Sequence, residues 1–255
     1  MSEVSYKDFD ILSEQDKAEA LALINRYDQL EKQDSCQGDF MSFIKHMWPE
    51  FIEGRHHKII ADKFNKIADG KLKRLIVCLP PRHSKSEFAS TFFPAWMMGR
   101  RGDLKIIQTT HTAELAVRFG RKVRNLIGSE EYQHVFPDLQ LQADNKSAGR
   151  WTSNQEGEFF AAGVGGAITG RGADLLVIDD PHSEQDALSP KALESAYEWY
   201  TSGPRQRLQP GGIIVIVMTR WSTKDLVGKV LNKQGEDHAD QWEVIEFPAI
   251  MPESE

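Results

Sequence analysis

A lysine and a serine hydroxyl side by side form the most chemically informative feature of this 255-residue sequence. Residues 74–90 read RLIVCLPPRHSKSEFAS, in which an apolar run predicts a strand, two prolines a turn, and Ser-Lys-Ser the start of a helix. In such a unit, the backbone N–H groups and the helix dipole attract phosphate oxygens. Lys85 would then reach the β- and γ-phosphates of a nucleotide, and Ser86 would hold Mg²⁺.

Residues 79–86 form this predicted phosphate loop. The common pattern of such loops is G-x-x-x-x-G-K-[ST], and here Leu79 and Ser84 stand where the two glycines belong. The residues expected to bind the nucleotide phosphates are Pro81, Arg82, His83, Ser84, Lys85, Ser86 and Glu87. The alternative interpretation is a basic turn that opens an ordinary helix.

Two adjacent carboxylates, Asp179 and Asp180, follow the apolar run at residues 175–178. This pattern predicts a buried parallel strand with acids at its C-terminal end, the edge where ligands of open α/β sheets bind. Asp179 there can hold Mg²⁺ through water, and Asp180 can orient or deprotonate an attacking water. Together with Lys85 and Ser86, the acid pair predicts phosphoryl transfer, which needs both a phosphate cradle and a metal anchor.

Three further residues extend the candidate site. Thr219 ends the apolar run at residues 213–218, where it either senses the γ-phosphate or caps its strand. Trp48 and His57 lie upstream of the loop strand, where adenine packing and core packing are both open interpretations.

The remaining sequence predicts the elements that position these groups. Strands are expected near residues 75–79, 104–109, 151–152, 158–162, 175–178, 213–218 and 242–247. Helices are expected near residues 13–32, 39–47, 56–68, 86–98 (with a kink or end near Pro94 and a stop at Gly99), 112–127, 189–203 and 224–233. Most of residues 137–157 is predicted to be loop. Strands that alternate with helices predict an α/β fold with a mostly parallel sheet.

Composition describes an ordinary globular protein, with 40% hydrophobic and 27% charged residues. Neither a signal peptide nor a membrane span is predicted, and two cysteines, one inside a predicted strand, favour a reduced intracellular protein. The net charge of −7 argues against a large nonspecific grip on nucleic acid. Local basic surfaces remain possible at Arg100-Arg101 and on the helix that carries Arg118, Arg121, Lys122 and Arg124, which is otherwise a solvated cationic face.

With these features placed, the chain resembles the ATPase domain of bacteriophage terminase large subunits, the motors that pump double-stranded DNA into empty capsids. The resemblance runs from about Trp48 to Pro248 and rests on PPRHSKSE, GGAITGRGADLLVIDDP, MTRWSTKDLVG and WEVIEFPAI. It implies an α/β P-loop NTPase of the RecA-like (additional-strand, catalytic-acid) type, with a mostly parallel sheet flanked by helices. It also implies hydrolysis of ATP with Mg²⁺ as cofactor.

The resemblance assigns roles within the phosphate loop and the acid pair. Lys85 matches the phosphate-binding lysine, Ser86 the metal-binding hydroxyl, and Asp179 the metal-anchoring aspartate. Asp180 stands where many members carry a catalytic glutamate, and its shorter side chain must lie closer to the water that it activates. Arg82 matches a loop arginine thought to contact the γ-phosphate or the acid pair.

Two further roles concern movement and neighbouring subunits. Thr219 matches the motif that couples hydrolysis to movement. Arg171 matches best an arginine finger that acts on a neighbouring subunit, with Arg121 and Arg124 as runners-up. Such a finger can contribute 10³ or more in rate, roughly 4 kcal/mol.

The resemblance also implies a domain plan and partners. Residues 1–47 would be an N-terminal helical extension, 48–248 the ATPase domain, and 249–255 the start of a linker to an absent C-terminal nuclease domain, so no nuclease activity is expected. The expected partners are double-stranded DNA, the portal protein of the procapsid and the small terminase subunit, with no membrane. The active form would be a homo-oligomeric ring, and the isolated domain a monomer. The expected location is the host cell cytoplasm, with transient docking on the procapsid.

Two other functions fit the same residues. A helicase-like, nucleic-acid-dependent ATPase shares the loop and the acid pair, but it needs a second motor domain. A nucleotide-binding module with little turnover is favoured by Ser84 and Asp180, which depart from the usual glycine and glutamate.

Overall fold

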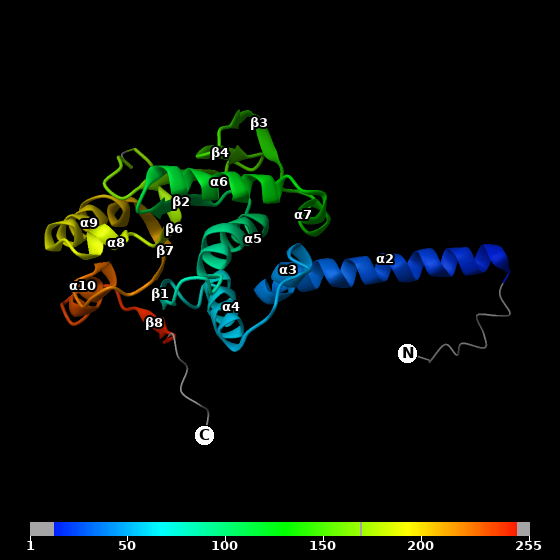
Figure 1. Cartoon of the computed structure of the whole chain (residues 1–255). Coiled ribbons are helices and arrows are strands. Elements are labelled where there is room, and N and C mark those ends of the chain that lie inside the picture. Colours follow the sequence, from blue (N-terminus) through cyan, green and yellow to red (C-terminus); the bar gives the residue numbers. More distant parts are fainter. Residues whose placement is uncertain (1–12, 169, 249–255) are drawn as a thin grey trace, which may run out of the picture.

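An eight-stranded sheet forms the centre of the structure, a computed structural model that describes residues 13–168 and 170–248 (Figure 1). The strand order is β3-β4-β5-β2-β6-β7-β1-β8. In chain order the strands are β1 (Arg74–Cys78), β2 (Lys105–Thr110), β3 (Leu141–Lys146), β4 (Arg150–Ser153), β5 (Glu158–Gly163), β6 (Ala173–Asp179), β7 (Leu208–Met218) and β8 (Glu243–Glu246). Every pairing from β5 across to β8 is parallel, and β4 pairs antiparallel with both β3 and β5.

The order of the central strands confirms the predicted fold. β7 lies between β1, which leads into the phosphate loop, and β6, which leads into the acid pair. This is the additional-strand order that the resemblance implies for a RecA-like P-loop NTPase. Cys78 pairs with Met218 and Asp179 with Val217, so the three strands end at the same edge of the sheet.

Helices flank the sheet, and most begin at a side-chain cap that the sequence predicts. The helices are α2 (Glu14–Gly38), α3 (Phe40–Met47), α4 (Arg55–Ala68), α5 (Phe93–Arg100), α6 (Ala113–Ile127), α7 (Glu130–Val135), α8 (Glu184–Ala187), α9 (Pro190–Ser202) and α10 (Leu226–Asn232). The side chains of Ser13, Asp39, Thr112 and Ser189 each accept an N–H from the first turn of their helix. The short helices α7 and α8 were not predicted.

Two strand predictions are wrong in extent. β3 and β4 occupy much of residues 137–157, which the sequence predicted as loop except at 151–152. β7 begins at Leu208 rather than at residue 213, so Pro210-Gly211-Gly212 lies inside the strand. The pairing with β6 shifts register between Ala173 and Leu175, and this irregularity accommodates the proline and glycines.

The helix after the phosphate loop contains a π-helical turn, η1 (Glu87–Phe92), before it continues as α5. At the junction, Phe93 donates its N–H to the Phe88 carbonyl five residues back. Pro94 has no N–H to close an ordinary turn, which favours a wider turn before it. The helix does not end near Pro94, and it also continues past the glycine predicted to close it.

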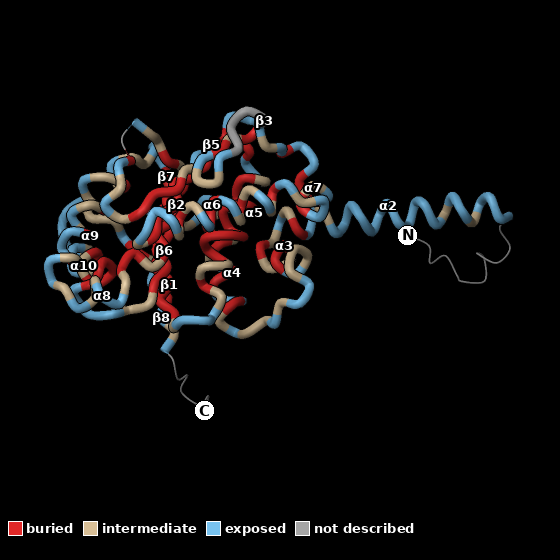
Figure 2. Tube along the Cα trace, turned by 45° about the horizontal axis from the view of Figure 1, so that its top comes forward, coloured by how far each residue is buried: buried red, intermediate tan, exposed pale blue. Residues whose placement is uncertain are grey.

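Two hydrophobic cores cover the two faces of the sheet, because side chains alternate along each strand. Along β1, Leu75 and Val77 belong to the core that includes α3, α4, α5 and α6, whereas Ile76 and Cys78 belong to the core that includes α9 and α10. Figure 2 shows the buried strands enclosed by the helices. Burial on both faces fixes the strand ends, and therefore the candidate site, in place.

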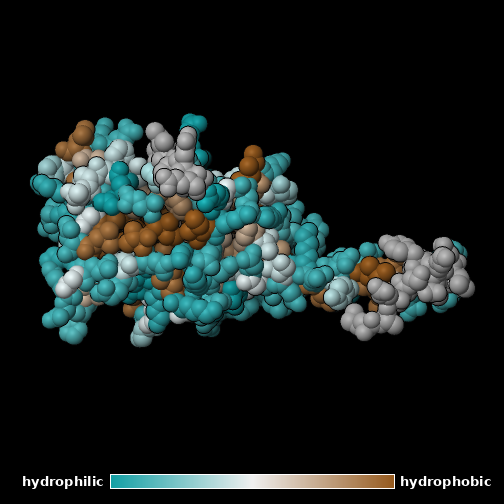
Figure 3. All heavy atoms as spheres, turned by 90° about the horizontal axis from the view of Figure 1, so that it is seen from below, coloured by the Kyte–Doolittle hydropathy of each residue, from teal (hydrophilic) through white to brown (hydrophobic). Residues whose placement is uncertain are grey.

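The N-terminal helix α2 projects from the body as an arm (Figure 1). Its C-terminal end is held by the buried Cys36 and by Gln33 and Gln37, whose amides donate to the Val135 carbonyl. Figure 3 shows apolar side chains on the arm. The exposed large ones are Leu21, Leu23, Ile24, Tyr27 and Leu30. In the described part of the chain, no helix has the length and apolar character that a membrane crossing requires.

The domain boundary at residues 47 and 48 stays a prediction. On the extension side, α3 contributes Phe40, Phe43 and Ile44 to the core that packs on β1. These residues thus support the body rather than the arm. Residues 1–12 of the predicted extension and the predicted linker at 249–255 lie outside the described residues.

Phe40→Ala tests the contribution of α3 to this core. The Phe40 ring lies 5.1–5.9 Å from four other aromatic rings, those of Phe64, Phe88, Phe93 and Trp96. We expect the variant to lower the free energy of unfolding by about 3–5 kcal/mol, measured by urea denaturation. Leu23→Ala on the arm, where the side chain is 66% exposed, should change it by less than about 0.5 kcal/mol. Equal losses in the two variants would contradict this account of the core.

Candidate functional site

The candidate site lies at the edge where β1, β6 and β7 end. The phosphate loop follows β1, Asp179 and Asp180 close β6, and Thr219 follows β7. The structure therefore brings together Lys85 and Ser86 with these three residues, as the sequence predicted. A carboxyl edge of parallel strands is the usual ligand-binding edge of such sheets.

Two non-glycine residues give the phosphate loop its shape. Arg82 and Ser84 have φ values of 65° and 59°, in the left-handed region that favours glycine. This conformation costs a residue with a side chain roughly 1–2 kcal/mol, so Ser84 adopts a glycine-like backbone without being glycine. Leu79 needs no such freedom, because its N–H donates to the Met218 carbonyl and continues the strand pairing.

Lys85 is the hub of the site. Its Nζ lies 2.8 Å from Asp180 Oδ2 and donates to Thr219 Oγ1 at 3.1 Å, although the side chain is only 7% exposed. The Thr219 N–H donates to Asp180 Oδ1 at 2.9 Å. The Thr219 hydroxyl donates to the Leu79 carbonyl at 3.2 Å. Lysine, aspartate and threonine thus form a closed set of contacts that joins the ends of the three strands.

Ser86 and Asp179 supply two oxygens suited to a magnesium ion. Ser86 Oγ donates to Asp179 Oδ1 at 3.0 Å, and Asp179 is buried. Mg²⁺ is bound by one or two protein oxygens, with substrate phosphates and water completing its shell. Across residues 13–168 and 170–248, no cluster of three or more His, Cys, Asp or Glu could hold a metal alone. The donor set fits Mg²⁺ held jointly with a phosphate.

Two residues that the sequence did not predict also contact the acid. Ser90 Oγ donates to Asp179 Oδ2 at 2.7 Å, and Gln108 Nε2 donates to Ser90 Oγ at 2.9 Å. Ser90 follows Ser86 by four residues, a spacing that places both on one side of a helix. Gln108 is a polar residue between apolar neighbours in β2. These two signals were present in the sequence.

Burial raises the pKa of Asp179 from its usual 3.8 to about 7. The neighbouring Asp180 carboxylate acts in the same direction. Hydrogen bonds from Ser90 and Ser86 and the charge of Lys85 oppose the rise. Asp179 therefore holds its proton more tightly than an ordinary aspartate, and a bound cation would favour its ionised form.

Three other loop residues have contacts of their own. Glu87 forms an ion pair with Lys122 on α6, which turns its carboxylate away from the loop. The His83 ring lies 2.9 Å from the Pro81 carbonyl. Arg82 is exposed within the loop, where it is accessible to a ligand.

Trp48 and His57 make packing contacts beneath the loop helix. The Trp48 ring stacks on Phe92 at 5.9 Å, and the His57 ring stacks on Phe88 at 5.0 Å. His57 Nδ1 accepts the Gly54 N–H, and burial lowers the pKa of His57 to about 4, so its ring is neutral near pH 7. The structure provides the packing role, and contact with a base stays a prediction.

Arg171 does not join the other predicted residues. It precedes β6, at the end of the strand opposite Asp179. Its guanidinium pairs with Glu158 at the start of β5 and lies 4.1 Å from the centre of the Phe160 ring. Arg121 lies exposed on α6. A role of Arg171 toward a neighbouring copy stays a prediction.

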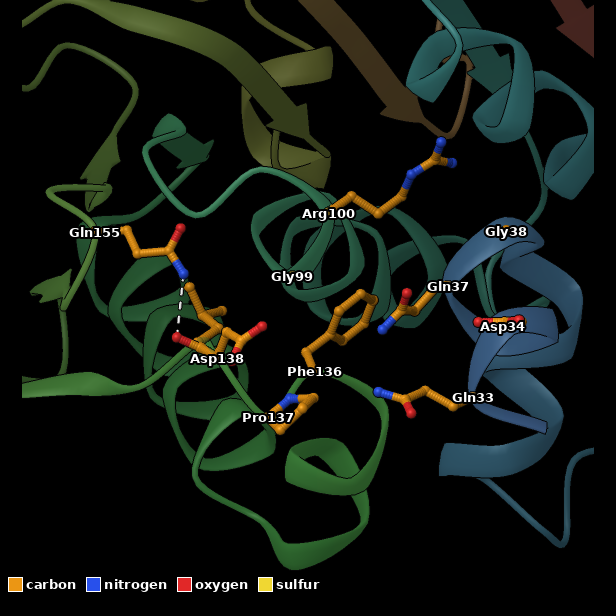
Figure 4. Close-up of a pocket in the computed structure, with 11 residues that line it drawn as sticks. Gln33, Asp34, Gln37, Gly38, Gly99, Arg100, Phe136, Pro137, Asp138 and Gln155 are labelled. Carbon is orange, nitrogen blue, oxygen red and sulfur yellow. Dashed lines mark hydrogen bonds between the residues drawn. The ribbon is translucent and has the colours of Figure 1, made fainter. Parts of the chain in front are cut away.

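A cavity of about 530 Å³ lies away from these residues, between the end of α2 and the end of α5 (Figure 4). Gln33, Gln37, Arg100 and Phe136 are among its lining residues, and none of the predicted site residues lines it. The candidate site is therefore defined by convergent polar groups and not by this hollow.

Comparisons with known proteins support the fold. The HK97 bacteriophage large terminase, known from a crystal structure, matches 86% of this chain and 45% of its own, with 10% sequence identity and a TM-score of 0.55. The large terminase of a thermophilic bacteriophage, in complex with ADP, matches 72% of this chain and 44% of its own, with 12% identity and a TM-score of 0.47. This chain thus spans less than half of either protein. No family model and no curated protein matches the sequence. The HK97 likeness shows a shared fold, as the sequence resemblance implied.

Asp179→Asn tests the burial of the acid. The folded chain binds the Asp179 proton more tightly than the unfolded chain, so this carboxylate destabilises the fold as pH rises from about 4 to about 7. Asparagine does not titrate. We expect the variant to gain stability relative to wild type over that range, by up to about 4 kcal/mol, in urea denaturation with EDTA.

Asp186→Asn is the matched control. The N–H of Ser183 lowers the pKa of Asp186, so its contribution is already complete above pH 5. Its difference from wild type should stay constant between pH 5 and 8. A constant difference for Asp179→Asn as well would contradict the raised pKa.

Proposed function

We propose that this chain is an ATPase that powers the translocation of double-stranded viral DNA into a procapsid. One observation carries the proposal: a loop lysine, a hydroxyl–carboxylate pair and a second carboxylate converge at one sheet edge. These groups are Lys85, the Ser86–Asp179 pair and Asp180. A phosphate cradle, a metal anchor and a water-activating group are the components that ATP hydrolysis requires.

The phosphate loop binds the nucleotide phosphates. The free N–H groups at the start of the helix point toward the bound anion, and the dipole of the helix favours its negative charge. Lys85 exchanges its contact with Asp180 for a phosphate oxygen, and Arg82 adds a second cation from the loop. Ser86 and Asp179 would hold Mg²⁺, which when bound neutralises charge that develops on the phosphates.

Asp180 orients and deprotonates the attacking water. Its Oδ2 contacts Lys85 and its Oδ1 accepts the Thr219 N–H. When a phosphate takes over the lysine, Oδ2 is released to accept a hydrogen bond from water, while Oδ1 stays fixed. The base therefore becomes available only when the nucleotide is bound.

Thr219 transmits this exchange to the rest of the domain. It contacts both Lys85 and Asp180, and the next residue, Arg220, pairs with the buried Asp225 at the start of α10. Asp225 also accepts the N–H of Trp221. A shift of Thr219 on hydrolysis would therefore move a turn that is rigidly tied to α10.

The partners follow from the sequence resemblance. We propose double-stranded DNA, the portal protein of the procapsid and the small terminase subunit, with an active ring of copies in the host cytoplasm that docks on the procapsid. A second candidate function is a nucleotide-binding module with little turnover. The pairing of the candidate base, Asp180, with Lys85 at 2.8 Å favours it.

Lys85→Ala and Asp180→Asn separate binding from hydrolysis. Lys85→Ala removes a phosphate contact, so we expect the affinity for a fluorescent ATP analogue to fall about tenfold or more. Asp180→Asn should bind the analogue but release phosphate about 10²–10⁴ times more slowly than wild type, with Mg²⁺ and DNA present. Lys233→Ala, which removes only an exposed pair with Glu236, should behave as wild type. Wild type and Asp180→Asn that bind ATP but are equally inactive would favour the binding module.

Arg171→Ala and Arg82→Ala distinguish a finger from a neighbour from one within the loop. We expect either variant to bind ATP and lose at least about 10³ in turnover. Mixing Arg171→Ala with Asp180→Asn should restore part of the activity, because an intact site then meets an intact neighbouring arginine. Arg82→Ala should not be rescued in this way.

Glu158→Gln controls for a structural role of Arg171. It removes the ion-pair partner but keeps the arginine. If Glu158→Gln lowers turnover as much as Arg171→Ala, or if mixing gives no rescue, Arg171 does not act as a finger.

A further inference from the structure

Two polar side chains, Ser90 and Gln108, are fully buried beneath the acid pair. Neither belongs to the phosphate loop, and both lie inside the core rather than at the open edge of the sheet. Burying an amide or a hydroxyl costs free energy unless it is hydrogen-bonded. Their presence at this point calls for a physical reason.

The hydrogen bonds of these residues run in one direction. The Gln108 amide nitrogen can only donate, and it donates to Ser90 Oγ at 2.9 Å. Ser90 therefore accepts from Gln108 and directs its single O–H to Asp179 Oδ2, at 2.7 Å. Gln108, Ser90 and Asp179 form a chain in which each residue fixes the orientation of the next.

The chain completes a two-sided grip on the carboxylate. Ser86 holds Asp179 Oδ1 from the loop side at 3.0 Å, and Ser90 holds Oδ2 from the core side. The π-helical turn η1 lies directly after Ser86 and includes Ser90. Two hydroxyls of one helix thus take the two oxygens of one acid, which leaves its plane little freedom to rotate.

Neighbouring groups show that these bonds are specific. Thr91, the next residue on the same turn, is also buried, yet in the described part of the chain its hydroxyl has no partner. Gln108 Oε1 likewise has no partner there, so Gln108 is half satisfied and contributes only through its nitrogen. An apolar residue would pack in β2 without this penalty.

We propose that Ser90 and Gln108 are positioning residues that hold Asp179 in the orientation and ionised state required to bind Mg²⁺. This inference rests on the proposed ATPase function. By occupying Oδ2 with an O–H donor, the pair directs Oδ1 and Ser86 toward the metal. Outer partners of metal ligands act in this way in other metal sites.

Ser90→Ala and Gln108→Met test the proposal through metal affinity. The readout is the Mg²⁺ concentration that gives half-maximal enhancement of binding of a fluorescent ATP analogue. We expect both variants to raise it about 10- to 100-fold while binding of the analogue in EDTA stays unchanged. Thr91→Val, which removes the unpartnered hydroxyl of the same turn, should match wild type.

The double variant tests whether Gln108 acts through Ser90. If it does, Ser90→Ala/Gln108→Met should resemble Ser90→Ala alone, whereas two additive losses would overturn the chain of action. Near-ultraviolet circular dichroism checks folding, and Gln108→Met decides the question if Ser90→Ala does not fold. Wild-type Mg²⁺ dependence in both single variants would overturn the positioning role alone. A wild-type protein without Mg²⁺-dependent nucleotide binding would overturn the proposed function as well.

Discussion

A nearly buried ammonium group needs an anion, and the contact between Lys85 and Asp180 meets that need. The two residues come from segments 95 positions apart that meet only because β7 pairs with both β1 and β6. Thr219, at the end of β7, contacts both partners. A phosphate is the other anion that can satisfy the lysine. The competition between phosphate and Asp180 links nucleotide binding to release of the base.

The site is held in costly conformations by the rigid body around it. Ser84 and Asp180 have positive φ values, and Asp179 is a buried acid whose pKa is raised to about 7. Such strain persists only where surrounding structure fixes the backbone. Here the fixing structure is the pair of cores on the two faces of the sheet, with Phe88 and Phe93 packing the loop helix onto α3 and α4. Stability elsewhere thus supports a locally unfavourable arrangement that suits ligand binding.

Features set by local sequence were predicted well. Caps such as Asp39 and Thr112, apolar runs such as that of β6, and the loop–acid pairing all follow from neighbouring residues. Features set by distant partners were not. β3 and the first half of β7 have few apolar residues and form strands because a neighbouring strand pairs with them. Ser90 and Gln108 gain meaning only where the helix and β2 meet Asp179.

The most direct measurement is a crystal structure of this chain with Mg²⁺ and a non-hydrolysable ATP analogue. The account predicts that Lys85 Nζ lies within about 3 Å of a phosphate oxygen and no longer contacts Asp180. It further predicts Mg²⁺ beside Ser86 and Asp179, and an Asp180 carboxylate that accepts a hydrogen bond from water. An analogue bound elsewhere, with Lys85 still paired to Asp180, would contradict it.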